Sequence, residues 1–147
     1  MKIISKRLFA VLAITCVSSL AIGQEPRSYS EGPVTNVTYI KILPGQFDAY
    51  MAYLGTTYKA MMEEQKKAGI ILDYRVYESQ ARSQDDADII LTTTYKNMAA
   101  LDGLDDRTEA ITAKIVGNRA KSTAASIDRG KMRELVGSQL IRELVLK

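Results

Sequence analysis

The sequence has no histidine, no tryptophan and a single cysteine, Cys16. Without imidazole it cannot form a Ser-His-Asp triad or the usual zinc and copper sites. Cys16 lies in an apolar segment that we expect to be removed, which leaves the mature chain without a thiolate ligand, a thiol nucleophile or a disulfide. We therefore predict no metal site and no cofactor.

Several short motifs are missing as well. The sequence contains neither G-x-S-x-G, the turn that presents a nucleophilic serine, nor G-x-x-x-x-G-K-[ST], the loop that holds phosphates. The acidic run Gln84–Asp88 is too short for a calcium-binding loop and lacks its glycine. These absences remove the common signatures of hydrolases, nucleotide-binding proteins and calcium sensors.

The first residues have the pattern of a secretory signal peptide. Lys2, Lys6 and Arg7 give a basic start, residues 8–22 carry no charge, and Ala21-Ile22-Gly23 places small residues where a signal peptidase reads. The uncharged run is shorter than the ~20 residues that span a bilayer. We predict cleavage of residues 1–23, a periplasmic or secreted bacterial protein, and no stable membrane anchor after cleavage.

The basic balance of the sequence belongs to this leader. The chain has 20 basic and 17 acidic residues, and the leader holds three of the basic ones and no acidic one. The mature chain is therefore formally neutral. Nucleic-acid binding needs a clustered positive surface, so we predict no nucleic-acid partner.

The mature chain is long enough for one domain. Residues 24–33, rich in proline and polar side chains, are expected to form a flexible lead-in to a domain over 34–147. Val34–Leu43 predicts a strand that ends at Pro44-Gly45. A helix follows from Gln46, because apolar side chains recur at steps of three and four: Phe47, Tyr50, Met51, Leu54, Tyr58, Met61 and Met62. Gly55 is expected to let this helix bend or approach the sheet closely.

The second half repeats the alternation of strand and helix. Ile70–Tyr77 and Asp88–Tyr95 predict two strands joined by a polar connection. Asn97 is a candidate N-cap. After an interruption at Gly103, the pattern predicts a short turn and one long helix over Arg107–Ile127 that is poor in bulky inward residues. The alternating tail Ser138–Leu146 predicts a fourth strand.

The resulting order is βαββαβ. Together with the strand-to-helix segment Val34–Leu54, the strand pair after it and the segment Tyr95–Asp102, this order resembles the dimeric α/β-barrel superfamily. The resemblance implies an α+β, ferredoxin-like sandwich with a four-stranded antiparallel sheet and two helices on one face. It implies a homodimer in which the bare faces of two sheets meet. It also implies haem binding in some members, but their axial histidine is absent here.

One predicted sheet face carries the candidate site. Its ligand-binding residues are Tyr39, Asp73, Arg75, Tyr77 and Thr92, next to Lys41 and Thr94. Val37, Ile71 and Ile90 are expected on the same face. Two interpretations stay open: a half-polar dimer interface, or a cavity where phenols and a guanidinium orient a small-molecule ligand. Asp73 and Arg75 are also placed to pair with each other.

Two functions follow from these interpretations. The first is an exported α/β-barrel homodimer with a binding or structural role and no assigned activity. The alternative is a cofactor-independent monooxygenase or isomerase acting on a small aromatic or oxygenated molecule, as the resemblance allows. No catalytic residue is identified by either.

Overall fold

The computed structural model describes residues 27–80, 82–83 and 85–147. The predicted leader, residues 1–23, lies outside them. The elements in chain order are β1 (Tyr29–Ile42), α1 (Phe47–Tyr53), a π-helical turn (Leu54–Tyr58), α2 (Lys59–Lys67), β2 (Asp73–Glu78), β3 (Ile89–Tyr95), a 3₁₀ turn (Met98–Leu101), α3 (Leu104–Ile115), α4 (Arg119–Gly130) and β4 (Arg133–Leu146).

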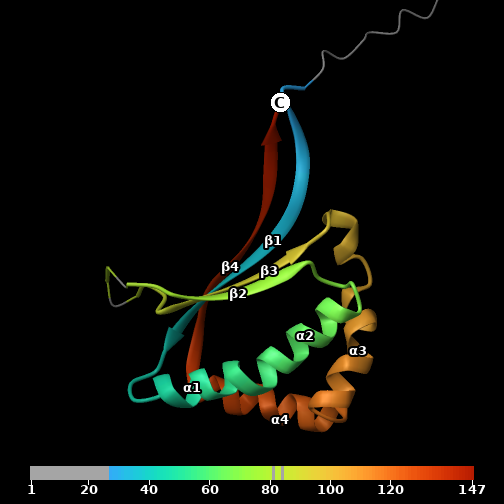
Figure 1. Ribbon diagram of the computed structural model, residues 1–147. Coiled ribbons are helices and arrows are strands. Elements are labelled where there is room, and N and C mark those ends of the chain that lie inside the picture. The colour runs from blue at the N-terminus through green and yellow to red at the C-terminus, as the bar shows by residue number, and fades with distance from the viewer. Residues whose placement is uncertain (1–26, 81, 84) are drawn as a thin grey trace, which may run out of the picture.

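The four strands form one antiparallel sheet in the order β2-β3-β1-β4. All helices lie on one side of it (Figure 1), and the opposite face carries no helix. This confirms the predicted α+β, ferredoxin-like βαββαβ arrangement. Within the described residues, no helix has the length and apolar character needed to cross a membrane.

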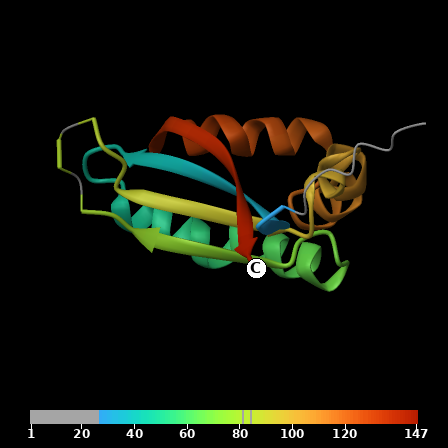
Figure 2. The ribbon, with the colours of Figure 1, turned by 90° about the horizontal axis from the view of Figure 1, so that it is seen from above.

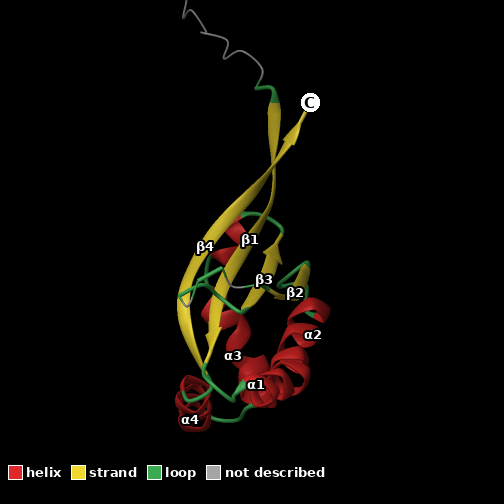
Figure 3. Cartoon of the chain, turned by 90° about the vertical axis from the view of Figure 1, so that its left-hand side faces the viewer, coloured by secondary structure: helices red, strands yellow, loops and turns green. Residues whose placement is uncertain are grey.

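β1 and β4 are much longer than predicted. β1 begins at Tyr29, so the residues up to Pro33 belong to a strand rather than to the predicted flexible lead-in, and β4 begins at Arg133 rather than Ser138. The added residues of β1 pair with the end of β4, from Tyr29 opposite Leu146, with a register shift between Glu31 and Val34. Those of β4 pair with the end of β1, where Arg133 is opposite Ile42. Proline lacks an N–H and fits such an irregularity. The two strands continue beyond β2 and β3 as a twisted arm (Figure 3).

The first helix supplies four of the nine buried residues of the core cluster. Tyr50, Leu54, Tyr58 and Met62 are all buried, at intervals of four residues. A strict four-residue interval turns by about 40° per step in an α-helix, and the wider π-helical turn at Leu54–Tyr58 takes up this drift. Gly55 lies in that turn and has no atom within 4 Å of a built Cβ. The expected close approach to the sheet at Gly55 was therefore wrong.

The second helical region is divided, and the prediction of one long helix was wrong. Gly117 has φ of 108°, a conformation that ends α3, and the Asn118 side chain accepts a hydrogen bond from the Lys121 N–H at 3.0 Å, which begins α4. The expected N-cap at Asn97 is confirmed by its 3.1 Å bond from the Ala100 N–H. Neither α3 nor α4 has a buried residue, in agreement with the predicted scarcity of bulky inward residues.

The core lies between the sheet and the first helix. It joins helix residues to β1 and β3 and to the segment before β2, and includes Ile40, Tyr50, Leu54, Tyr58, Met62, Ile70, Ile71, Ile89 and Tyr95. Viewed from above, the α1–α2 helix lies beneath β2 and β3, whereas α4 lies on the β4 side (Figure 2). α4 contributes nothing to this core.

Candidate functional site

The face of the sheet away from the helices is here called the open face. Alternation along each strand and the antiparallel register together decide which side chains lie on it. Tyr39 is opposite Ile90, which is opposite Tyr77, and the next row runs from Val37 through Thr92 to Arg75. The members of the open face are Thr35, Val37, Tyr39, Asp73, Arg75, Tyr77, Ile90, Thr92, Thr94, Gln139 and Ile141.

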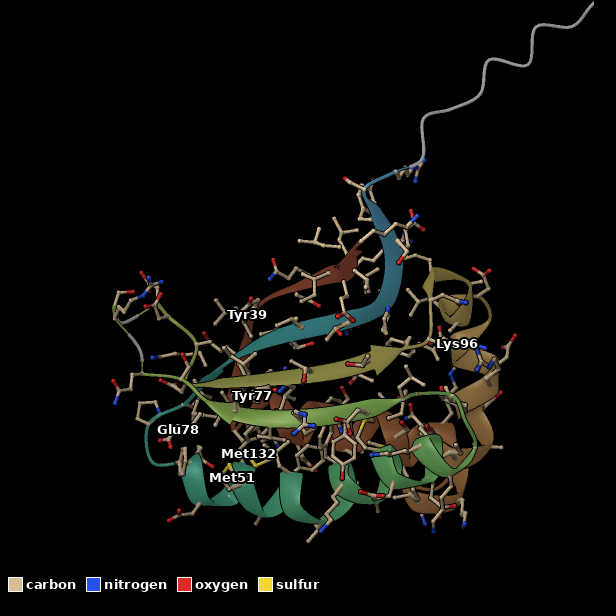
Figure 4. All side chains as sticks on the ribbon, turned by 45° about the horizontal axis from the view of Figure 1, so that its top comes forward. Tyr39, Met51, Tyr77, Glu78, Lys96 and Met132 are labelled. Atoms are coloured by element: carbon tan, nitrogen blue, oxygen red, sulfur yellow. The ribbon has the colours of Figure 1, made fainter. Side chains whose placement is uncertain are left out.

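All five predicted site residues lie on the open face. Three come from β2, namely Asp73, Arg75 and Tyr77, while Tyr39 and Thr92 come from β1 and β3. Figure 4 shows Tyr39 and Tyr77 on this side of the sheet and Met51 and Met132 on the helix side. The sequence pattern therefore brought the correct side chains together on one surface. Whether that surface binds a ligand stays a prediction.

One expected member is misplaced. Ile71 is only 3% exposed and packs in the core, because β2 begins two residues later, at Asp73. Gln139 and Ile141 of β4 join the open face instead, opposite Val37 and Thr35. The alternation of the C-terminal tail could have indicated them, but their row depends on a register shift between Tyr39 and Ile40 that no sequence pattern reveals.

The polar side chains of the open face largely bond one another. Gln139 donates from Nε2 to the Tyr39 hydroxyl at 2.8 Å, and the hydroxyls of Thr35 and Thr94 are 3.0 Å apart. Arg75 and Asp73 pair at 3.0 Å, as the sequence suggested. Such internal pairing leaves few polar groups directed toward a ligand, and it lowers the cost of covering the face.

Asp73 has a second partner from the helix layer. Lys66, near the end of α2, donates to its Oδ1 at 3.0 Å across the sheet edge. This hydrogen bond holds the pKa of Asp73 below its ordinary value, with smaller contributions that include the charge of Arg75. Asp73 is therefore ionised at neutral pH and is already bound to two cations, which does not suit a general base.

Two phenols on the helix side have strongly raised pKa values. Burial raises the pKa of Tyr58 to about 12. The Tyr74 hydroxyl donates to Glu63 Oε1 at 2.7 Å, and this hydrogen bond raises the pKa of Tyr74 to about 12. Both phenols stay protonated at neutral pH, so neither is poised to act as a phenolate base.

A separate groove of about 560 Å³ lies between α3 and α4. It is far in sequence from the predicted site and shares no residue with it. Most of the residues that line it have polar side chains, among them Asp105, Asp106, Glu109, Thr112, Asn118 and Arg119. In the part of the chain that the structure describes, no three acidic side chains come together in an arrangement that could hold a metal ion.

Comparison with known proteins identifies the fold. No protein-family model matches the chain, and no curated protein matches its sequence. Among solved structures, HapK from Hahella chejuensis matches with a TM-score of 0.51 and 13% identity, covering 75% of this chain and 91% of that one. A protein from Shewanella oneidensis matches with a TM-score of 0.51 and 11% identity, covering 80% of this chain and 96% of that one.

A dimeric ferredoxin-like protein from an uncultured marine organism also matches, with a TM-score of 0.50 and 13% identity, covering 80% of this chain and 98% of that one. The chain has the ferredoxin-like fold. This confirms the predicted resemblance at the level of fold, since identities this low carry no information about activity. In this ferredoxin-like chain, the open face is the sheet surface left without helices.

Proposed function

We propose that the protein is an exported homodimer with a binding or structural role, in which the open faces of two copies meet. The observation that carries the proposal is the combination of apolar side chains and internally paired polar groups on one uncovered sheet face. Tyr77 is 48% exposed there, beside Tyr39 and Ile90, while the polar side chains between them bond one another. A second copy can cover such a face without leaving many polar groups unpaired.

The long β4 strand supports a partner of the same kind. It is an edge strand, and half of its residues are large apolar side chains exposed to solvent. Exposed edge strands of this character pair with another chain unless they are blunted. Ile141 links them to the open face, so one two-fold interface could cover both. The exposed apolar residues of β4 are Leu135, Val136, Leu140, Ile141, Leu144, Val145 and Leu146.

The dimer is tested by introducing a charge into the open face. We expect Tyr77→Asp to give a monomer or insoluble protein, because each two-fold interface would then bury two unpaired carboxylates. Mass measured by light scattering after size exclusion reads this out. Ile127→Asp is the matched control, since Ile127 is 61% exposed on α4, away from the open face. A monomeric unmutated protein at micromolar concentration would refute the dimer.

The enzymatic alternative, a cofactor-independent monooxygenase or isomerase, depends on the same surface. Tyr39 and Tyr77 lie in one row with Arg75 in the next, so a cavity closed by a second copy would have phenols and a guanidinium in its wall. The internal pairing of these polar groups favours the binding or structural role. Native mass spectrometry of protein purified from its own compartment tests for a cavity between the two copies. A retained organic molecule would indicate a ligand-binding cavity, and a mass without ligand would indicate an interface that holds none.

Export is the remaining part of the proposal. It depends on the basic, then uncharged, then small-residue pattern of residues 1–23. Expression of the full sequence in a bacterial host that has a periplasm should give a periplasmic protein. Its intact mass should correspond to a chain that begins at Gln24. An exported product that retains residues 1–23 would contradict this.

A further inference from the structure

Two arginines and two tyrosines meet on the helix side of the sheet, where the end of α4 and the start of β4 approach α1. The guanidinium carbon of Arg129 is 5.4 Å from the ring centroid of Tyr53. The rings of Tyr50 and Tyr53 are stacked, with centroids 5.8 Å apart. Arg133, the first residue of β4, is opposite Ile42 and so faces the core side. These four residues, Tyr50, Tyr53, Arg129 and Arg133, are here called the arginine–tyrosine cluster.

Local structure brings the two arginines together. α4 ends at Gly130, and the turn after it is closed by a 3.0 Å hydrogen bond from the Met132 N–H to the Arg129 carbonyl. This turn places the last arginine of α4 and the first residue of β4 on the same side. Tyr50 and Tyr53, three residues apart on α1, share one helix face.

The cluster concentrates positive charge without a counter-charge. Neither Arg129 nor Arg133 forms a salt bridge with any described residue. The neighbouring Asp128 is bound by Lys131 at 2.7 Å. Moreover, the Nε of Arg133 is buried and has no hydrogen-bond acceptor among the described atoms. A buried donor without a partner is destabilising, so this arrangement calls for an acceptor.

The positive charges of Arg129 and Arg133 both act on the Tyr50 phenol. Burial raises the pKa of the Tyr50 phenol, and the charges of Arg133 and Arg129 oppose that rise. This agrees with the geometry, in which the Arg129 guanidinium lies over the Tyr53 ring and Arg133 is on the core side of β4. The position of Arg129 in the last turn of α4 is favourable for its own charge, but a helix dipole does not explain the unpaired Nε of Arg133.

The cluster has a closed side and an open side. Tyr50 is 1% exposed and forms the floor, whereas Tyr53, Arg129 and Arg133 are half-buried and reach solvent. Met51 and Met132, the chain neighbours of Tyr50 and Arg133, lie on the helix side of the sheet (Figure 4), and thioethers make favourable contacts with aromatic rings. An incoming group would meet two cations against an aromatic and thioether wall.

We propose that the arginine–tyrosine cluster binds the carboxylate of a small aromatic acid. A carboxylate matches the planar fork of arginine and supplies the acceptor that the Arg133 Nε lacks. The attached ring packs against Tyr53 and the two methionine side chains. This site is on the opposite side of the sheet from the open face, so it does not depend on the proposed dimer.

The proposal is tested by titrating the full mature protein with 1-naphthoate. Binding is followed by calorimetry and by the fluorescence of 1-naphthoate itself, which no tryptophan obscures. We expect saturable binding that is weakened about tenfold or more in Arg133→Met and in Arg129→Met, because each removes a charge-assisted contact. Arg82→Met, at an arginine in the connection between β2 and β3 whose side chain is 91% exposed, is the matched control and should bind as the unmutated protein does.

Further arms distinguish the chemistry. Neutral 1-naphthylmethanol tests the charge, and acetate and inorganic phosphate test the ring; all three should bind at least about tenfold more weakly than 1-naphthoate. The Nε–H resonance of Arg133 should shift on 1-naphthoate binding, which a merely structural arginine would not show. Arg133→Lys, which keeps the charge and the stem, guards against misfolding of Arg133→Met.

Three results would overturn the proposal. The first is no saturable binding of 1-naphthoate at millimolar concentration. The second is equal affinity in folded Arg129→Met, Arg133→Lys and Arg82→Met. The third is phosphate binding as strong as that of 1-naphthoate with the same dependence on Arg129, which would reveal a general anion site.

Discussion

The two helical layers of this chain contribute very differently to the fold. The first, formed by α1, the π-helical turn and α2, buries Tyr50, Leu54, Tyr58 and Met62 against the sheet. The second, formed by α3 and α4, has no buried residue, and α4 contributes nothing to the core. Both layers follow a strand in the same βαβ pattern, yet only the first has fully buried side chains, while α3 packs the partly buried Leu104 and Ile111 against the core.

The difference teaches that a helix can be specified by its ends rather than by its buried face. α4 begins where Gly117 takes a left-handed conformation and Asn118 caps the first turn, and it is rich in alanine, serine and threonine. Capping defines where such a helix starts, but it buries little apolar surface. A lightly held second layer also leaves Arg129 and Arg133 at its edge, half-buried rather than enclosed.

The largest expected effect comes from the first layer. Leu54 is 3% exposed in the core, so Leu54→Ala should lower the free energy of unfolding by about 2–5 kcal/mol through lost burial and a residual cavity. Urea denaturation at one fixed protein concentration measures it, because dimerisation would couple to stability. Ile127→Ala on α4 is the control and should change stability by no more than about 0.5 kcal/mol. Equal losses would erase the contrast between the layers.

Alkaline pH should reveal the first layer through Tyr58. Burial holds its pKa at about 12 in the folded chain, against about 10 in an unfolded chain. Because the pKa is higher in the folded chain, the buried protonated phenol of Tyr58 contributes fully to stability below about pH 10, and this contribution is lost as the pH rises through 12. Tyr58→Phe should therefore make stability fall less steeply between these values. An unchanged slope in urea denaturation across this range would contradict the burial of its hydroxyl.

The smallest expected effect concerns the second layer. Asn118→Ala removes the side-chain acceptor of the 3.0 Å bond from the Lys121 N–H and should cost about 1 kcal/mol. Amide hydrogen exchange should show the loss mainly within α4, since no apolar side chain of α4 packs against the core. Asn118→Asp keeps the cap and serves as the control. Uniform loss of protection across α1 and α2 would show that the layers are coupled more tightly than their packing implies.

Much of the open face could be predicted because strand alternation is local. Tyr39, Arg75, Tyr77 and Thr92 were assigned to one surface from their spacing alone, and the register confirms that placement. Ile71 was misassigned because the length of β2 depends on which residues β3 can pair. The arginine–tyrosine cluster could not be found in this way, since its members lie about 80 residues apart and meet only through the turn after α4.

The sequence by itself determined the order of elements, the inward stripe of the first helix, the cap at Asn97 and the absence of imidazole chemistry. Each of these depends on residue type or on spacing within a few turns. Only the tertiary structure decided the length of the β1–β4 arm, the division of the second helix and the meeting of Arg129 and Arg133 with Tyr50 and Tyr53. Those features depend on strand register and on packing between distant segments, which a local pattern does not contain.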